Sequence, residues 1–104
     1  MEMGGFSNVE NNASIRGYIM RCLVKGYHFA LPVKTLSNKM MSCGLIDTPD
    51  ISDQLYYLEQ NDLIKFSNKS NSLNALNNDA VVRLTANGIR FIENGGNPEM
   101  GIDL

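Results

Sequence analysis

Few side chains in this chain of 104 residues are of types that could do chemistry, and their spacing decides what each can do. Asp50 and Asp53 lie three residues apart, which would place two carboxylates on one side of a helix. Paired carboxylates can share acid–base work. Both residues also fall in the first turn of a predicted helix, where negative charge is stabilised by the helix dipole. We therefore expect these carboxylates to be structural.

His28 is the single histidine, and Cys22 and Cys43 are the two cysteines. A catalytic histidine needs an oriented partner, and none can be identified in the sequence, so we expect His28 to be structural or exposed. Isolated thiols on predicted helices are typical of small buried hydrophobic side chains. Because there is no Cys/His cluster, no Gly-rich phosphate loop and no nucleophile motif, the sequence predicts no metal site, no cofactor and no enzyme.

Length and composition indicate a single globular domain with a real core. No apolar run approaches the roughly 18–20 residues of a membrane span, so membrane insertion is not expected. The start, MEMGG, lacks the basic and apolar regions of a secretory signal, which predicts a cytoplasmic location. The formal net charge of −2 lacks the basic excess of a strong nucleic-acid binder, although basic side chains can still gather locally.

The best-marked element is a helix over residues 48–60, which would carry the two carboxylates. Asp47 or Thr48 can cap its first turn through a side-chain oxygen. Pro49 suits the first helical position, where the missing N–H is no loss. Apolar residues recur at spacings of four and three, which predicts one core-facing stripe: Ile51, Leu55 and Leu58.

Two more helices are predicted before this one. A loose arm, residues 1–11, precedes a helix at 13–25 that Asn12 caps. Residues 27–31 indicate a brief strand or an extended connector, and a second helix at 32–43 follows. The second helix and the well-marked helix after it are joined by a slightly extended turn, which predicts a helix-turn-helix.

The second half of the chain predicts a hairpin and a last helix. Two apolar runs, 63–66 and 80–84, flank a long polar loop, 67–79, in which Leu73 and Leu76 are expected to pin the loop or form a brief turn of helix. Thr85 caps a helix at 85–94. We expect Ile89 and Ile92 to face inward, Gly88 to be a weak point, and the tail to dock on a neighbour through Met100, Ile102 and Leu104.

Two phrases resemble those of winged helix-turn-helix domains. YYLEQNDLIKF is similar to the segment that leads from the third helix into the wing, and VVRLTANGIRFIENG is similar to the second wing strand and the helix after it. The likeness covers residues 12–95 and is greatest to small uncharacterised winged-helix proteins of Mu-like phages and prophages. It implies an α+β, mainly helical fold with three helices, a two-stranded wing and a C-terminal helix, between the arm 1–11 and the tail 96–104.

The resemblance also implies a function, which is that of a regulator of transcription that binds double-stranded DNA as a homodimer. In DNA-binding relatives the third helix enters the major groove and the wing lies on the backbone. Carried over by position, the exposed face of the third helix would consist of Ser52, Gln54, Tyr56 and Tyr57. The predicted DNA contacts are Lys34, Thr35 and Lys39 in the second helix, Ser52, Gln54 and Tyr57 in the third, and Lys65, Lys69 and Arg83 in the wing.

The third predicted helix departs from that pattern. Between Thr48 and Ile64 there is no Lys or Arg, whereas four residues are acidic: Asp50, Asp53, Glu59 and Asp62. The alternative is therefore an interaction module, in which this acidic helix and the Tyr56/Tyr57 pair meet a protein partner. One of the two tyrosines is expected to pack at the core edge with its hydroxyl in water. The DNA-binding hypothesis requires four of the predicted contacts, all of them cations, to share one face of the folded domain: Lys34, Lys39, Lys69 and Arg83.

Overall fold

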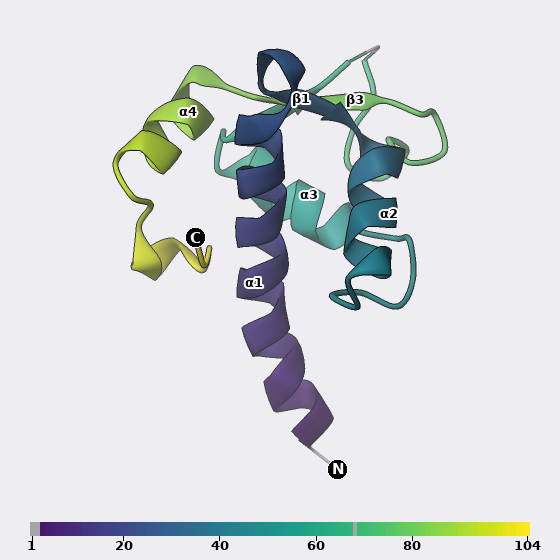
Figure 1. The fold of residues 1–104 in the computed structure, drawn as a ribbon, viewed down its shortest axis with the longest axis vertical. Coiled ribbons are helices and arrows are strands. Elements are labelled where there is room, and N and C mark those ends of the chain that lie inside the picture. Colours follow the sequence, from purple (N-terminus) through teal and green to yellow (C-terminus); the bar gives the residue numbers. More distant parts are fainter. Residues whose placement is uncertain (1–2, 68) are drawn as a thin grey trace.

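The computed structural model describes the backbone of residues 3–67 and 69–104, and within that part the side chains of residues 12–67, 69–97 and 99–104. Its elements follow one another as shown in Figure 1. They are α1 (Met3–Lys25), the 3-10 turn η1 (Tyr27–Phe29), β1 (Ala30–Pro32), α2 (Val33–Ser42), α3 (Ser52–Gln60), β2 (Ile64–Phe66), β3 (Val81–Leu84), α4 (Ala86–Glu93) and the 3-10 turn η2 (Pro98–Met100).

The described residues confirm an α+β fold, with four α-helices and a small antiparallel sheet. The predicted hairpin of β2 and β3 is present, and β1 adds a third strand, so that the sheet order is β1-β3-β2. Arg83 is level with Ala30 on one side and with Lys65 on the other. Residues 27–31, for which a strand or a connector was predicted, contain both a 3-10 turn and the start of this strand.

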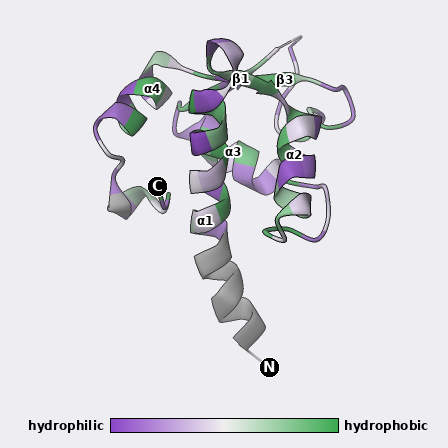
Figure 2. Ribbon diagram, viewed as in Figure 1, coloured by the Kyte–Doolittle hydropathy of each residue, from purple (hydrophilic) through white to green (hydrophobic). Residues whose placement is uncertain are grey.

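The core lies between the inner face of the sheet and the three helices α1, α2 and α3. The predicted stripe of the third helix is confirmed, because Ile51, Leu55 and Leu58 are all buried. Helix α1 contributes Ile15, Ile19, Met20 and Leu23, α2 contributes Val33, Leu36 and Met40, and the sheet contributes Ile64, Val82 and Leu84. Figure 2 shows hydrophobic and hydrophilic residues on the same helices, as expected of amphipathic elements.

Helix α1 is longer than predicted. It begins at Met3 instead of near Ala13, and Asn12 lies inside it and does not cap it. Once a helix has formed, each added residue gains a hydrogen bond without a new nucleation step, so weak helix formers can extend it. In Figure 1 its first turns project beyond the other elements. Residues 1 and 2 of the predicted arm lie outside the described residues, and the division into arm, domain and tail stays a prediction.

Helix α3 begins later than predicted, at Ser52 with Ile51 in the cap position. Neither of the two predicted caps precedes it directly, because the backbone there has another role. The carbonyl of Pro49 accepts a hydrogen bond of 2.7 Å from the buried Ser37 hydroxyl on α2, which holds the connecting loop against that helix. The Asp50 carboxylate accepts a bond of 3.0 Å from the Ser52 N–H. The helix ends at Gln60, as predicted, with Asn61 in the C-terminal cap position.

The C-terminal part of the chain folds back on the N-terminal part. Thr85 caps α4 as predicted, since its Oγ1 accepts a bond of 3.0 Å from the Gly88 N–H. The tail does not extend from the domain, because Ile102 is only 4% exposed and the Asp103 N–H donates to the Ala13 carbonyl at 3.0 Å. The predicted docking of the tail therefore takes place within the chain, on α1.

Candidate functional site

Two of the predicted contact residues of α3 face α1 and the tail. The Gln54 amide accepts a bond of 2.8 Å from the Arg16 Nε and donates one of 2.8 Å to the Asn12 side chain. The Tyr57 hydroxyl donates to the Met100 carbonyl, and the Arg16 guanidinium lies 3.7 Å from the centre of the Tyr57 ring. These side chains thus join three distant segments of the chain.

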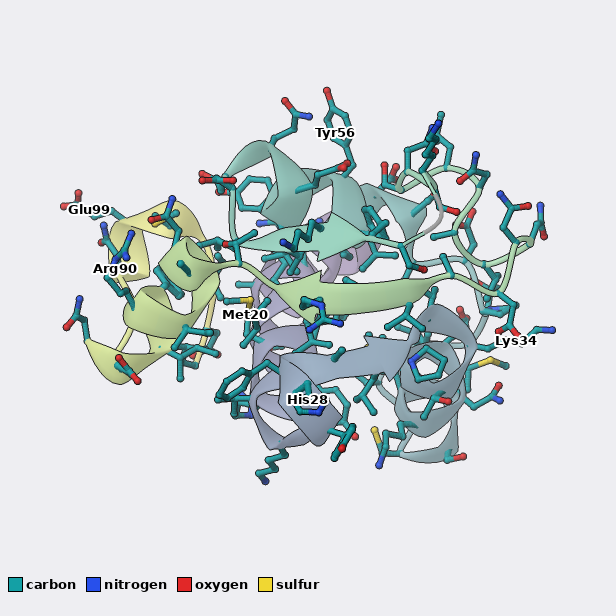
Figure 3. All side chains as sticks on the ribbon, turned by 90° about the horizontal axis from the view of Figure 1, so that it is seen from above. Met20, His28, Lys34, Tyr56, Arg90 and Glu99 are labelled. Carbon is teal, nitrogen blue, oxygen red and sulfur yellow. The ribbon has the colours of Figure 1, made fainter. Side chains whose placement is uncertain are left out.

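The expected common face of α3 is therefore divided in two. Gln54 and Tyr57 are half-buried on one side, whereas Tyr56 is 55% exposed and extends away from the ribbon in Figure 3. The expectation that one tyrosine packs at the core edge is confirmed for Tyr57, but its hydroxyl bonds the Met100 carbonyl and is not left to water. Contact of Gln54 or Tyr57 with DNA stays a prediction, and it would require breaking the bonds that these side chains make.

The cations of the predicted wing lie on the outer face of the sheet. Lys65 and Arg83 are register partners on β2 and β3, and both are exposed. Val82, the next residue on β3, is buried, so the two cations point away from the core. The Arg83 Nη1 donates to the His28 carbonyl at 3.4 Å. Lys69 is exposed in the loop after β2, with a positive φ of 58°.

The cations of α2 lie elsewhere. Lys34 and Lys39 are five residues apart, which separates them by about 140° around a helix. Lys34 lies at the edge of the molecule in Figure 3. Lys39 lines a hollow of about 270 Å³ together with Leu31, Arg21 and Lys25. The remaining predicted contact on this helix, Thr35, is half-buried.

Strand register places Lys39 and Arg83 on opposite sides of the sheet. Leu31, which lines the hollow beside Lys39, is level with the buried Val82, so it points to the inner face. Arg83 points to the outer face. The four cations Lys34, Lys39, Lys69 and Arg83 therefore do not share one face, although the DNA-binding hypothesis requires it.

A second hollow lies between the outer side of α3 and the loop that joins β2 to β3. It has a volume of about 410 Å³, and two exposed apolar side chains line it, Tyr56 from the helix and Leu73, which is 78% exposed, from the loop. The remaining lining residues are polar or acidic: Ser52, Asp53, Glu59, Asn71 and Ser72. No Lys or Arg of the described chain is among them.

The loop that presents Leu73 is held by its own hydrogen bonds. The Asn71 side chain accepts from the N–H groups of Leu73 and Asn74 at 2.9 and 3.1 Å, and the Asn74 side chain accepts from the Asn71 N–H at 2.8 Å. The backbone bonds from Ala75 to Asn71 and from Asn78 to Asn74 each close a single turn, and residues 69–79 contain no helix. Leu76 packs against the core, but Leu73 does not pin the loop as the sequence suggested.

The side chains of types that could do chemistry differ in their surroundings. Asp50 is exposed, and hydrogen bonds from Ser52 lower the pKa of its carboxyl group. Cys22 is half-buried, and Cys43 is exposed, which contradicts the prediction that both thiols are buried. Burial first, and then the neighbouring Cys22 and Cys43 thiols, raise the pKa of the Tyr18 hydroxyl. In the described part of the chain no group of His, Cys, Asp and Glu side chains could hold a metal ion.

Within the described residues, none of the helices has the length and apolar character needed to cross a membrane. No family model, curated protein or solved structure matches the chain. Its function is therefore inferred from the surfaces described above.

Proposed function

We propose that this chain is a winged-helix domain that binds a protein partner through the hollow between α3 and the β2–β3 loop. The order of elements from α1 to β3, with the first strand paired to the last, supports a winged-helix fold. Such a fold presents the third helix and the adjacent loop on the surface, and it serves both DNA-binding and protein-binding domains.

The observation that carries this proposal is the exposure of Tyr56 and Leu73 in one hollow. Burying a large apolar side chain gains about 1.5–3 kcal/mol, so two such side chains from neighbouring elements form a favourable centre for an interface. Tyrosine is also frequent among the residues that contribute most binding energy. The carboxylates of Asp53 and Glu59 lie at the same hollow, so a fitting partner combines an apolar side chain with Lys or Arg.

The same charges argue against the insertion of α3 into a major groove. Two like charges about 4 Å apart repel by about 1 kcal/mol in water, and by more where water is excluded. Asp53 and Glu59 would face phosphates in that position, and no cation of α3 would offset them. Gln54 could read a base edge only after releasing Arg16 and Asn12.

A second candidate function is the binding of double-stranded DNA by the wing. Lys65 and Arg83, adjacent on the outer face of β2 and β3, support it, and Lys69 adds a third cation in the loop. The resemblance to phage winged-helix proteins favours this candidate as a regulator of transcription. A homodimer would double the few phosphate contacts that one copy offers.

A selection from a random peptide library tests the leading proposal. We expect the selected peptides to combine aromatic or aliphatic residues with Lys or Arg, and to bind less tightly as salt increases. Tyr56→Ala should weaken their binding about tenfold or more. The double variant Asp53→Asn/Glu59→Gln should weaken it and remove most of the salt dependence, whereas Lys65→Gln should have no effect.

Titration with a long mixed-sequence DNA duplex separates the two candidates. Salt-sensitive duplex binding that is lost on Lys69→Ala or Arg83→Ala and unaffected by Tyr56→Ala would favour the wing. If the selected peptides are acidic, or if they bind Tyr56→Ala as tightly as the original chain, the proposed protein site is wrong.

A further inference from the structure

Three consecutive ring-bearing residues lie outside the core between α1 and β1. We call Tyr27, His28 and Phe29 the aromatic turn. Tyr27 is 83% exposed and Phe29 is 39% exposed, and the rings of Tyr27 and His28 meet edge to face with their centres 3.9 Å apart. Figure 3 shows His28 on the side of the sheet that faces away from the helices. Exposed aromatic side chains next to one another are uncommon on a surface that contacts only water.

The backbone of the aromatic turn is strained. His28 and Phe29 have φ values of 54° and 62°, the left-handed region that side chains other than glycine rarely adopt. Each such residue costs about 1–2 kcal/mol. Bonds at both ends hold the conformation, from the Phe29 N–H to the Gly26 carbonyl at 3.0 Å and from Arg83 to the His28 carbonyl at 3.4 Å. These bonds fix the backbone from which the three rings project at the surface.

The surface beside the aromatic turn is basic. The turn leads directly into Ala30, which is level with Arg83 and, one strand further, with Lys65. Neighbouring strands are about 4.8 Å apart, so the two cations follow the aromatic turn as a short row across the sheet. The three strands, all within the described residues, carry no other charged side chain and no carboxylate.

We propose that the aromatic turn and this basic row form a binding site for single-stranded nucleic acid. Bases stack on exposed aromatic rings, and cations beside the rings neutralise the phosphates. A duplex already stacks its bases on one another and offers no free base face to Tyr27 or Phe29. An acidic peptide would satisfy Arg83 and Lys65 but would make no use of the flat rings. The combination of rings with cations therefore favours a single strand.

This site is separate from the hollow of the proposed protein partner. Figure 3, which views the sheet from above, shows Tyr56 and His28 at opposite edges of the sheet, with the strands between them. The hollow has two carboxylates and no lysine or arginine among its described lining residues, whereas the sheet face has two cations. One domain would thus hold a basic protein segment at α3 and a nucleic-acid strand at the aromatic turn. Neither proposal depends on the other.

Fluorescence anisotropy with a labelled oligothymidylate tests the site. We expect binding at low salt, with log K falling against log salt at a slope of about −1.4 for two phosphate contacts. Tyr27→Ala should weaken binding about tenfold, because a base–aromatic stack contributes on that order. Lys65→Gln should reduce the salt slope to about −0.7. Phe29→Ala should weaken binding less than Tyr27→Ala, since Phe29 is less exposed.

Two matched variants serve as controls. Tyr56→Ala removes the exposed tyrosine of the other site, and Lys34→Gln removes an exposed cation of α2 that lies away from His28 in Figure 3; both should leave oligothymidylate binding unchanged. The proposal fails if the oligonucleotide does not bind at low salt, or if Tyr27→Ala and Tyr56→Ala affect it equally. If a duplex binds more tightly than the oligonucleotide and Tyr27→Ala does not change its affinity, Lys65 and Arg83 serve duplex binding by the wing and the proposal is wrong. If polyglutamate binds tightly, the two cations serve an acidic protein partner and the proposal is also wrong.

Discussion

Gly88→Ala should destabilise the domain, although the same change usually stabilises a helix. Alanine in place of glycine within a helix gains about 0.5–1 kcal/mol. At Gly88, however, the added Cβ would lie 2.2 Å from the carbonyl oxygen of Leu63. Carbon and carbonyl oxygen normally approach to about 3.3 Å, so the helix or the carbonyl must move by about 1 Å.

Neither group is free to move. The Leu63 carbonyl accepts a bond of 3.0 Å from the Thr85 N–H, immediately before α4, and Leu63 itself is buried. Overpacking of this kind costs about 1–3 kcal/mol, which exceeds the gain in helix propensity. We therefore expect a net loss of about 1–2 kcal/mol and a fall in Tm of about 5–15 °C. The sequence suggested a weak point at Gly88, and the structure explains it as a point of close contact.

Urea unfolding followed by circular dichroism measures this loss. Ala86→Gly, at an exposed position of the same helix, reports the propensity contribution alone and should cost no more than about 1 kcal/mol. If Gly88→Ala leaves the unfolding free energy unchanged or raises it, α4 does not pack on the Leu63 carbonyl as described.

Two further predictions concern the tail and the loop before α3. Ile102→Ala should lower the free energy of unfolding by about 2–5 kcal/mol because it empties a buried site. Leu104→Ala, at a partly exposed position, should lower it much less. Equal effects of the two variants in urea unfolding would mean that the tail does not pack on α1. The pKa of Asp50 is lowered in the folded state, so its stabilising contribution is present above the ordinary pKa of an aspartate and is lost as pH falls through the lowered value. Asp50→Asn should therefore reduce the loss of stability on acidification, as measured by the urea midpoint between about pH 5 and pH 3; an unchanged acid dependence would contradict the assignment.

Local signals predicted those parts of the fold that depend on neighbouring residues. The cap of α4 is such a case, because the Thr85 hydroxyl accepts its hydrogen bond from the N–H of Gly88, only three residues further along the chain. The Ile51, Leu55 and Leu58 stripe follows from helical period alone, and all three are buried. The cap of α3 was predicted wrongly at Asp47 or Thr48, because the Pro49 carbonyl is bonded to Ser37 on another helix. No pattern within the predicted helix contains that information.

The orientation of the α3 side chains depended on contacts still further away. Gln54 and Tyr57 lie three residues apart on the polar side of the predicted helix, so the sequence placed them on the free surface with Tyr56. Their partners are Arg16 and Asn12 in α1 and Met100 in the tail, and pairings over such distances leave no local signal. Arg16 carried one signal of these contacts. It lies on the packed side of α1, where a half-buried cation needs polar partners.

These internal contacts also bear on what α3 can do. A helix that enters a DNA groove needs free polar side chains along one face. Here the Arg16 side chain bonds Gln54, stacks on Tyr57 and donates to the Gly101 carbonyl at 3.1 Å, so one side of α3 is used to join α1 to the tail. On the other side of α3 the exposed residues are Asp53, Tyr56 and Gln60, and none of them is basic. The exposed rings of the aromatic turn lie next to Arg83 and Lys65 at the sheet, so affinity for a single strand is to be sought there, and affinity for a basic protein segment at α3.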